Sequence, residues 1–183
     1  MEQNIVRKEM WNIAAHAGLV LGSISIAYMF ITQWIAGTPS FINVALNMLL
    51  WAAKSIGCIW MMMHFMKKYV AGHPKAENRD TFNLGMATAL LSALVYSAAV
   101  FANVAFISEG AIIEQMNLYI QNSTPVLDSN SLAMMETFMQ KLPQITFFSN
   151  LIYCTAFGTV LSFILSRNIP SRDPFAEYKP DQQ

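Results

Sequence analysis

Long apolar runs separated by short polar segments make up most of the chain. Four of these runs reach the length of about 20 residues that a helix needs to cross a hydrocarbon core about 30 Å thick. They cover residues 11–35, 42–66, 82–107 and 145–165. The pattern predicts an all-α membrane protein, in which a four-helix transmembrane bundle over residues 1–168 precedes a flexible tail over residues 169–183.

The segment between the third and fourth runs, residues 108–144, is long for an unstructured connection. Its stretches 111–121 and 131–142 place apolar residues on one helical face. Because Pro125 and Pro143 punctuate these stretches, we expect short amphipathic helices that are separate from the fourth span. They would form a helical insertion at the extracytoplasmic face of the membrane.

Basic residues mark one side of the expected bundle. Nine of the eleven Lys and Arg residues lie before the first run, between the second and third runs, or after the fourth. The positive-inside rule places this side in the cytoplasm, so we expect both termini and residues 67–80 there. We expect the cations on this side to meet anionic lipid headgroups or a cytoplasmic partner. These cations are Lys67, Lys68, Lys75, Arg79 and Arg167.

The composition agrees with this picture and excludes other classes of protein. Only 12% of the residues are charged, against about 25% in a typical soluble domain. The chain has no basic surface interleaved with aromatic residues, which argues against nucleic-acid binding. Cys58 and Cys154 lie inside apolar runs, so we expect free thiols. No two histidines have the spacing of a helical metal site, and no nucleophile motif or paired carboxylates occur. We therefore expect no cofactor, no metal site and no catalytic residue.

Small and polar residues recur at helical spacing in three of the runs. Because lipid tails are as apolar as leucine, such stripes decide how helices associate in a bilayer. The stripes either face one another within the bundle or form a seam in a homo-oligomer. They comprise Gly18 and Gly22 in the first run, Gly85, Ala89, Ser92, Tyr96, Ala99 and Asn103 in the third, and Asn150, Cys154, Gly158 and Ser162 in the fourth.

The second run carries a lysine near its middle. Lys54 lies twelve residues after Ile42, or roughly 18 Å along a helix, and a lysine at that depth costs about 2.5–3.5 kcal/mol on insertion scales. No Asp or Glu occurs in any of the four runs. Three arrangements remain open: the amine is neutral, it donates hydrogen bonds within the bundle, or it binds an anion such as phosphate or carboxylate. A purely structural role in helix packing is a further alternative. The polar residues expected to form an intramembrane site with Lys54 are Asn47, Ser92, Asn103 and Asn150.

Three stretches of the chain resemble a known family. They read NRDTFNLGMATALLSALVYSAAVF (78–101), METFMQKLP (135–143) and FFSNLIYCTAFGTVLSFILSR (147–167). Their succession resembles an uncharacterised membrane family of Bacteroidota, domain of unknown function 4199, over roughly residues 8–168. The resemblance implies a four-span protein of a bacterial inner membrane with no established activity. It also implies a possible partner, because genes of this family often lie beside a glycosyltransferase similar to polyprenyl-phosphate sugar transferases.

These observations predict a non-enzymatic accessory or anchoring subunit for a membrane-associated enzyme, such as a polyprenyl-phosphate glycosyltransferase. The basic loop 67–80 and the tail would be its docking surface, and Lys54 would help to seat an anionic lipid or polyprenyl phosphate. The alternative is a small oligomeric transporter, channel or flippase-like protein in which Lys54 binds an anion or a lipid headgroup. An integral-membrane enzyme is less favoured, because the four runs lack carboxylates and a metal cluster.

Overall fold

Helices joined by short connections form the part of the chain that the computed structural model describes, which is residues 2–35, 41–73, 76–108, 110, 112–114, 118 and 129–169. The elements are α1 (Glu2–Ile35), α2 (Phe41–Gly72), α3 (Asn78–Ala102), the π-helical turn η1 (Asn103–Ile107) and α5 (Ser129–Asn168). The four α-helices, the third extended by η1, contain stretches long and apolar enough to cross a membrane. The prediction of an all-α bundle with four spans is therefore confirmed, and the chain is a multi-pass membrane protein.

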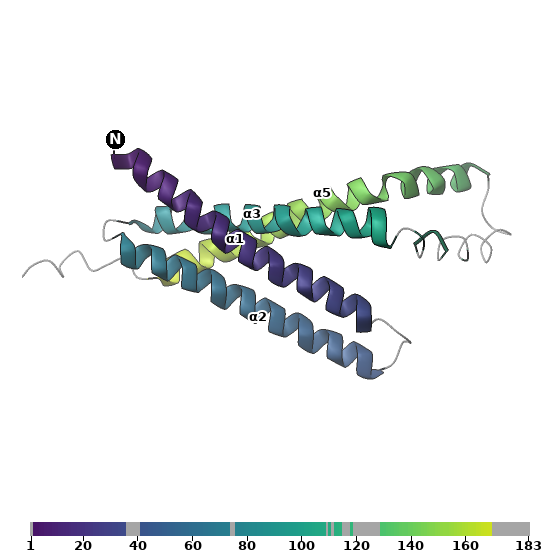
Figure 1. Cartoon of the computed structure of the whole chain (residues 1–183), viewed down its shortest axis with the longest axis horizontal. Coiled ribbons are helices and arrows are strands. Elements are labelled where there is room, and N and C mark those ends of the chain that lie inside the picture. Colours follow the sequence, from purple (N-terminus) through teal and green to yellow (C-terminus); the bar gives the residue numbers. More distant parts are fainter. Residues whose placement is uncertain are drawn as a thin grey trace, which may run out of the picture.

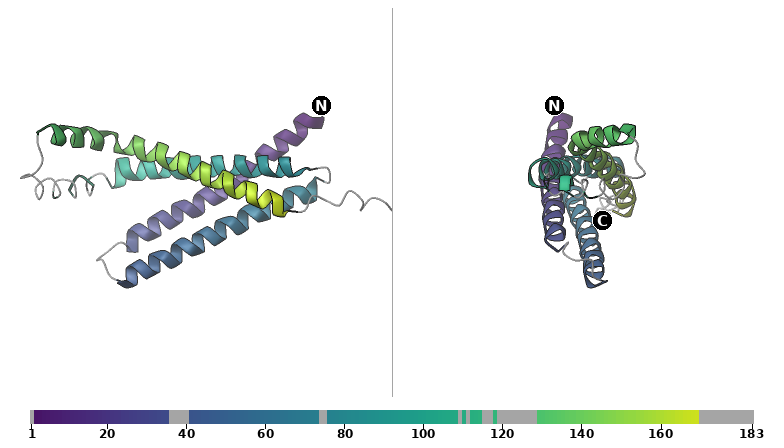
Figure 2. Two further views of the ribbon diagram at one scale, coloured as in Figure 1. Left: turned by 180° about the vertical axis from the view of Figure 1, so that it is seen from behind. Right: turned by 90° about the vertical axis from the view of Figure 1, so that its right-hand side faces the viewer.

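The helices form two pairs that cross. α1 and α2 run side by side as an antiparallel hairpin, and α5 runs along α3 (Figure 1). α1 also packs against α3, so that α3 contacts both its own partner and the first hairpin. Toward the α1–α2 connection the two pairs diverge like the arms of a V (Figure 2). We call that end the open end, and the opposite end, which holds the α2–α3 connection, the basic end.

Glycines allow the close approaches between these helices. A Cβ on Gly18 or Gly22 of α1 would lie 2.7 Å from Leu91 Cβ or 2.8 Å from Val95 Cγ1 of α3, closer than real Cβ atoms come. A Cβ on Gly158 of α5 would lie 2.5 Å from Ala89 Cβ of α3, and one on Gly85 would clash with the side chain of Ser162. Small residues let helix backbones meet in a bilayer, and the small-residue stripes of the first, third and fourth runs do face one another.

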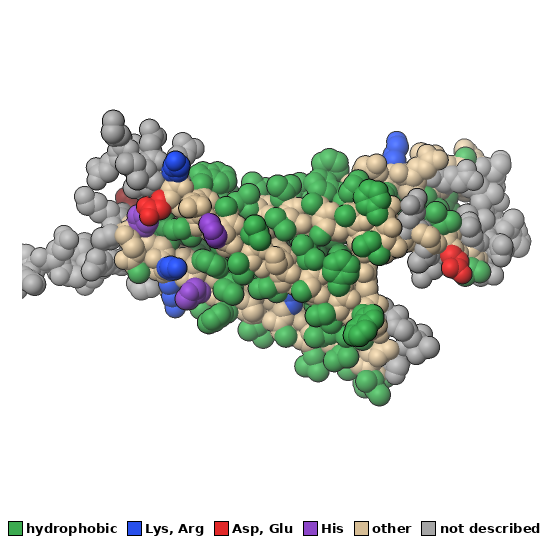
Figure 3. Space-filling model, viewed as in Figure 1, with side chains coloured by type: hydrophobic (Ala, Val, Ile, Leu, Met, Phe, Trp, Pro, Cys, Tyr) green, Lys and Arg blue, Asp and Glu red, His purple; other side chains and the backbone are tan. Residues whose placement is uncertain are grey.

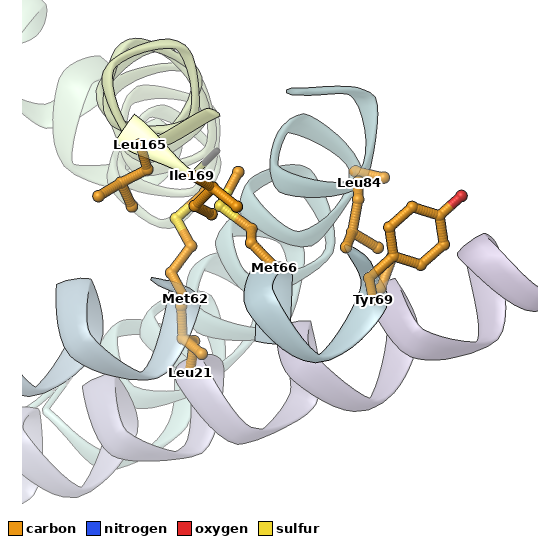
Figure 4. Packing of buried hydrophobic residues seen from close by; sticks show 9 residues of the cluster. Leu21, Met62, Met66, Tyr69, Leu84, Leu165 and Ile169 are labelled. Atoms are coloured by element: carbon orange, nitrogen blue, oxygen red, sulfur yellow. The ribbon is translucent and has the colours of Figure 1, made fainter. Parts of the chain in front are cut away.

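The buried hydrophobic core lies toward the basic end. Met62 and Met66 of α2 extend toward Leu165 and Ile169 at the end of α5 (Figure 4). Tyr69, the next buried residue of α2, lies beside Leu84 of α3 (Figure 4). The flexible methionines fill the irregular space between helices whose facing residues are small. This core joins the end of α2 to both α3 and α5.

One predicted boundary is wrong. Pro143 does not separate an insertion helix from the fourth span, because α5 is continuous from Ser129 to Asn168 with the proline inside it. A proline removes one hydrogen bond and crowds the preceding turn, which kinks a helix without ending it when both flanks favour helix. α5 changes direction along its length in Figure 1. Pro125, most of the stretch 111–121 and the tail from residue 170 lie outside the described residues.

Candidate functional site

Lys54 of α2 lies between two tyrosine rings of other helices. Its Nζ atom is 5.1 Å from the ring centroid of Tyr28 in α1 and 5.4 Å from that of Tyr96 in α3. Both distances fall within the range of cation–π attraction, which contributes about 0.5–1 kcal/mol per contact at exposed sites and more where water is excluded. All three side chains are half-buried. The two rings therefore replace part of the solvation that Lys54 loses on entering the membrane.

Two thiols complete the surroundings of Lys54. Cys58, one turn further along α2, lies close to Lys54 and to Ser25 of α1. Cys154 of α5 lies close to both Lys54 and Tyr96. Both cysteines are free thiols. The site thus draws one or more side chains from each of the four long helices, and we call Tyr28, Lys54, Cys58, Tyr96 and Cys154 the lysine cluster.

No carboxylate balances the charge of Lys54 among the residues that the structure describes. Glu9, Glu77 and Asp80 lie at the basic end, and the one ion pair found in these residues joins His73 Nε2 to Glu9 Oε2 at 3.3 Å. Asp80 is engaged by the backbone of Glu77, whose N–H donates to Asp80 Oδ2 at 3.1 Å. The four apolar runs contain no Asp or Glu at all. Lys54 is therefore surrounded by aromatic faces and thiols, with no anion in contact.

The four polar residues predicted to form a site with Lys54 have the following surroundings. Asn47 is on the same face of α2, two turns before Lys54, and its buried Oδ1 atom has no hydrogen-bond partner. Asn103 is buried in η1, and its Oδ1 atom is also without a partner. The backbone of Ser92 packs against Gly18 and Gly22 at the α1–α3 crossing. Asn150 Nδ2 donates to Thr146 O of its own helix at 2.8 Å. Among the described residues, no hydrogen bond joins Lys54 to any of these four.

Sequence reasoning missed Tyr28 altogether and placed Tyr96 only in a packing stripe. The sequence did contain a chemical signal for both tyrosines. A cation at mid-depth with no carboxylate in any span needs another electron-rich group, and a tyrosine ring is the next best one. Tyr28 and Tyr96 lie inside the first and third runs, away from the membrane interfaces where tyrosine is common. A search for tyrosines within the spans would have found both.

The predicted contact residues for a partner gather at the basic end. Lys67 and Lys68 near the end of α2, Arg79 at the start of α3 and Arg167 at the end of α5 are all exposed. The guanidinium of Arg167 also lies over the ring of Phe163, 4.3 Å from its centroid. Lys75 lies outside the described residues. In the space-filling view, hydrophobic side chains cover the middle of the molecule and most charged side chains lie near its ends (Figure 3).

The described residues contain no group of three or more His, Cys, Asp or Glu side chains that could hold a metal ion. Comparison of the chain with protein-family models, with curated proteins and with solved structures gives no match. The resemblance to the Bacteroidota membrane family therefore stays a prediction. What the sequence and the helices establish together is a multi-pass, all-α membrane protein with a lysine cluster inside its bundle.

Proposed function

We propose that the protein is a non-enzymatic accessory subunit that anchors a membrane-associated enzyme through its basic end. The observation that carries the proposal is a set of cations that four helices present on one side of the molecule. All are exposed, and none forms an ion pair with a carboxylate among the described residues. Such a surface attracts acidic protein surfaces and phosphate groups. The set comprises Lys8, Lys67, Lys68, Arg79 and Arg167.

The enzyme that we propose as partner is a polyprenyl-phosphate glycosyltransferase at the cytoplasmic face of a bacterial inner membrane. Its identity comes from the resemblance, and the cytoplasmic position of the basic end comes from the positive-inside rule. An enzyme that acts on a lipid phosphate has to be held at the bilayer surface, where each Lys or Arg contributes about 1 kcal/mol of attraction to anionic lipid. A basic membrane anchor meets both requirements.

The test is co-purification of the partner with variants of the full-length protein. The tagged chain is isolated from its native membrane in a gentle detergent, and the bound proteins are identified by mass spectrometry. We expect a glycosyltransferase in stoichiometric amount with the native chain, and a loss of at least about fivefold with Lys67→Gln/Lys68→Gln. Lys141→Gln, an exposed lysine near the open end, is the control and should retain the enzyme. A native chain that emerges alone, or equal recovery from all three proteins, would contradict the proposal.

The proposed orientation has its own test. In a chain whose two native cysteines are replaced by alanine, a single cysteine at Asn78 probes the basic end and one at Gln140 probes the open end, because both positions are exposed. We expect a membrane-impermeant maleimide added to intact spheroplasts to label the Gln140→Cys variant and not the Asn78→Cys variant. The reverse pattern would place the basic end outside the cell and remove the anchoring proposal.

The lysine cluster favours a second candidate, a small oligomeric transporter, channel or flippase-like protein in which Lys54 binds an anion in transit. Its carrying observation is the position of Lys54 between Tyr28 and Tyr96, without a carboxylate partner among the described residues. Intramembrane charges commonly mark transport pathways. Anion flux into proteoliposomes that disappears with Lys54→Met and persists with Lys54→Arg would favour this candidate over the anchor.

A further inference from the structure

One stripe of α2 is packed at the basic end and uncovered at the open end. Val44, Met48 and Trp51 continue, at helical spacing, the same face that carries Met62, Met66 and Tyr69. The last three are 4%, 1% and 2% exposed, whereas the first three are 58%, 71% and 62% exposed. The space-filling view shows the molecule hollowed between its two arms at the open end (Figure 3). Over its first half, the face of α2 that meets α3 and α5 further on is thus left uncovered by the described residues.

Lys54 lies beside the stripe, about 60° around α2 from Trp51, at the level where the stripe changes from uncovered to packed. It lies three residues after the exposed Trp51 and eight residues before the buried Met62. Its ammonium group has aromatic faces on two sides and forms no ion pair with a carboxylate among the described residues. A purely apolar neighbour such as a lipid tail would supply no counter-charge for this group.

The depth of Lys54 restricts which anion can reach it. Lys54 is thirteen residues after Phe41, or roughly 20 Å along α2, while phospholipid phosphates lie at the edges of a core about 30 Å thick. A second copy of the chain cannot supply the anion either, since none of its four spans contains Asp or Glu. A carboxylate on a membrane-spanning helix of a different protein would lie at this depth, because the helix itself crosses the hydrocarbon core.

We propose that the uncovered stripe of α2 binds a transmembrane helix of a different protein, and that an Asp or Glu near the middle of that helix pairs with Lys54. This deepens the proposed function, on which it rests, by naming the contact that the anchored complex makes inside the membrane. The apolar side chains Val44, Met48 and Trp51 pack against the incoming helix. The carboxylate supplies the charge complement of Lys54, and the tyrosines fix the position of the ammonium group.

Site-specific photo-crosslinking in the native membrane tests the contact. A benzophenone amino acid replaces Trp51 in one variant and Leu49 in the control. These positions are 62% and 68% exposed and lie about 160° apart around the same helix at nearly the same depth. We expect the Trp51 variant to crosslink one heterologous membrane protein, through a spanning segment that contains Asp or Glu. The Leu49 variant should crosslink lipid only.

Charge variants then test the pairing. Added to the Trp51 crosslinker, Lys54→Met should lower the yield at least about tenfold, because the partner's carboxylate loses its counter-charge, while Lys54→Arg should retain the yield. Lys54→Asp should abolish the crosslink, and replacing the acid of the captured helix by lysine should restore it. Folding of each variant is checked by its size-exclusion profile and helical circular dichroism, and the restored pair excludes misfolding as the cause of any loss.

Several outcomes overturn the inference: crosslinks from Trp51 to lipid alone, crosslinks to a second copy of the chain, a captured helix without an acid, or a yield that Lys54→Met leaves unchanged. The two proposals fail separately. An enzyme that co-purifies through the basic end while Trp51 captures no helix leaves the anchor standing and overturns the intramembrane contact. A captured acidic helix with no co-purifying enzyme does the reverse.

Discussion

The two halves of α2 carry similar apolar residues and have opposite surroundings. Near the basic end Met66 is enclosed by α3 and α5, whereas near the open end Met48, on the same stripe, faces out of the protein. Hydrophobicity does not explain the difference, since the residue type is the same. The facing residues do, because Gly85 brings α3 so close to Ser162 of α5 and to Met66 that no Cβ fits there. In a bilayer, close approach between small residues decides which apolar faces are packed.

The largest loss of stability should come from adding a side chain at Gly85, in the packed half of the molecule. In Gly85→Leu the new Cβ alone would lie 2.6 Å from Met66 Cε and would clash with Ser162. We expect a loss of at least about 3 kcal/mol in the free energy of unfolding, at the upper end of overpacking costs. The measurement is unfolding by sodium dodecyl sulfate in mixed micelles, followed by circular dichroism. Gly57→Leu is the matched control, because a Cβ on Gly57 meets nothing within 4 Å. Equal stability of the two variants would show that the close approach of α3 and α5 is not what holds the basic end together.

Truncation of Met66 and of Met48 should lower the free energy of unfolding by different amounts, both smaller than the loss expected for Gly85→Leu. Met66→Ala opens a cavity among buried side chains and should lower the free energy of unfolding by about 2 kcal/mol, at the low end of core truncations because lipid supplies no hydrophobic term. Met48→Ala removes the same atoms from a side chain that is 71% exposed, so we expect a change below about 0.5 kcal/mol. Mixed-micelle unfolding of both proteins provides the comparison. A similar loss in both would mean that the open half of α2 is covered within the isolated protein.

Replacement of Lys54, which lies at the boundary between the two halves of α2, should raise the free energy of unfolding slightly. Lys54→Met removes an insertion cost of about 2.5–3.5 kcal/mol and also two cation–π contacts that together contribute about 2 kcal/mol. We expect the isolated variant to gain about 1 kcal/mol of stability, as measured by the same unfolding assay. The control is Tyr28→Leu, which removes one ring and retains the charge, and which should be less stable than the native chain. A strongly destabilised Lys54→Met protein would make Lys54 a structural element and would argue against a partner.

The parts of this fold that the sequence predicted are those that depend on neighbouring residues in the chain. Length and apolar character define a span locally, so the four spans were found. The spacing of Gly18 and Gly22 left two interpretations open, contact within the bundle or a seam in a homo-oligomer. In the structure both glycines face α3. The boundary at Pro143 failed, because the break signalled by a proline is overcome when both flanking segments are helical. Propensity at one residue was outweighed by the continuity of the turns around it.

The lysine cluster depends on how the helices cross, which no single run reveals. Asn150 lies on a span and was a reasonable partner for Lys54, but its amide is used by Thr146 of its own helix. Tyr28 and Tyr96 lie on two helices that approach each other closely at Gly22, and both rings lie near Lys54 of a third helix. The sequence therefore singled out Lys54 but not the two tyrosine rings that lie beside it.

The smallest effect tests a single hydrogen bond in the packed half. Ser162 Oγ donates to Phe82 O of α3 at 2.9 Å, whereas Ser166, one turn later on α5, donates to Phe163 O of its own helix at 3.0 Å. Both serines are buried. Because only the first bond joins two helices, Ser162→Ala should lower the free energy of unfolding by about 0.6 kcal/mol, the average for such bonds in membrane proteins, and Ser166→Ala should change it less. Replicate unfolding curves with both variants resolve this difference. A larger loss for Ser166→Ala would mean that bonds within α5, and not its contact with α3, stabilise the half of the bundle in which the helices are packed.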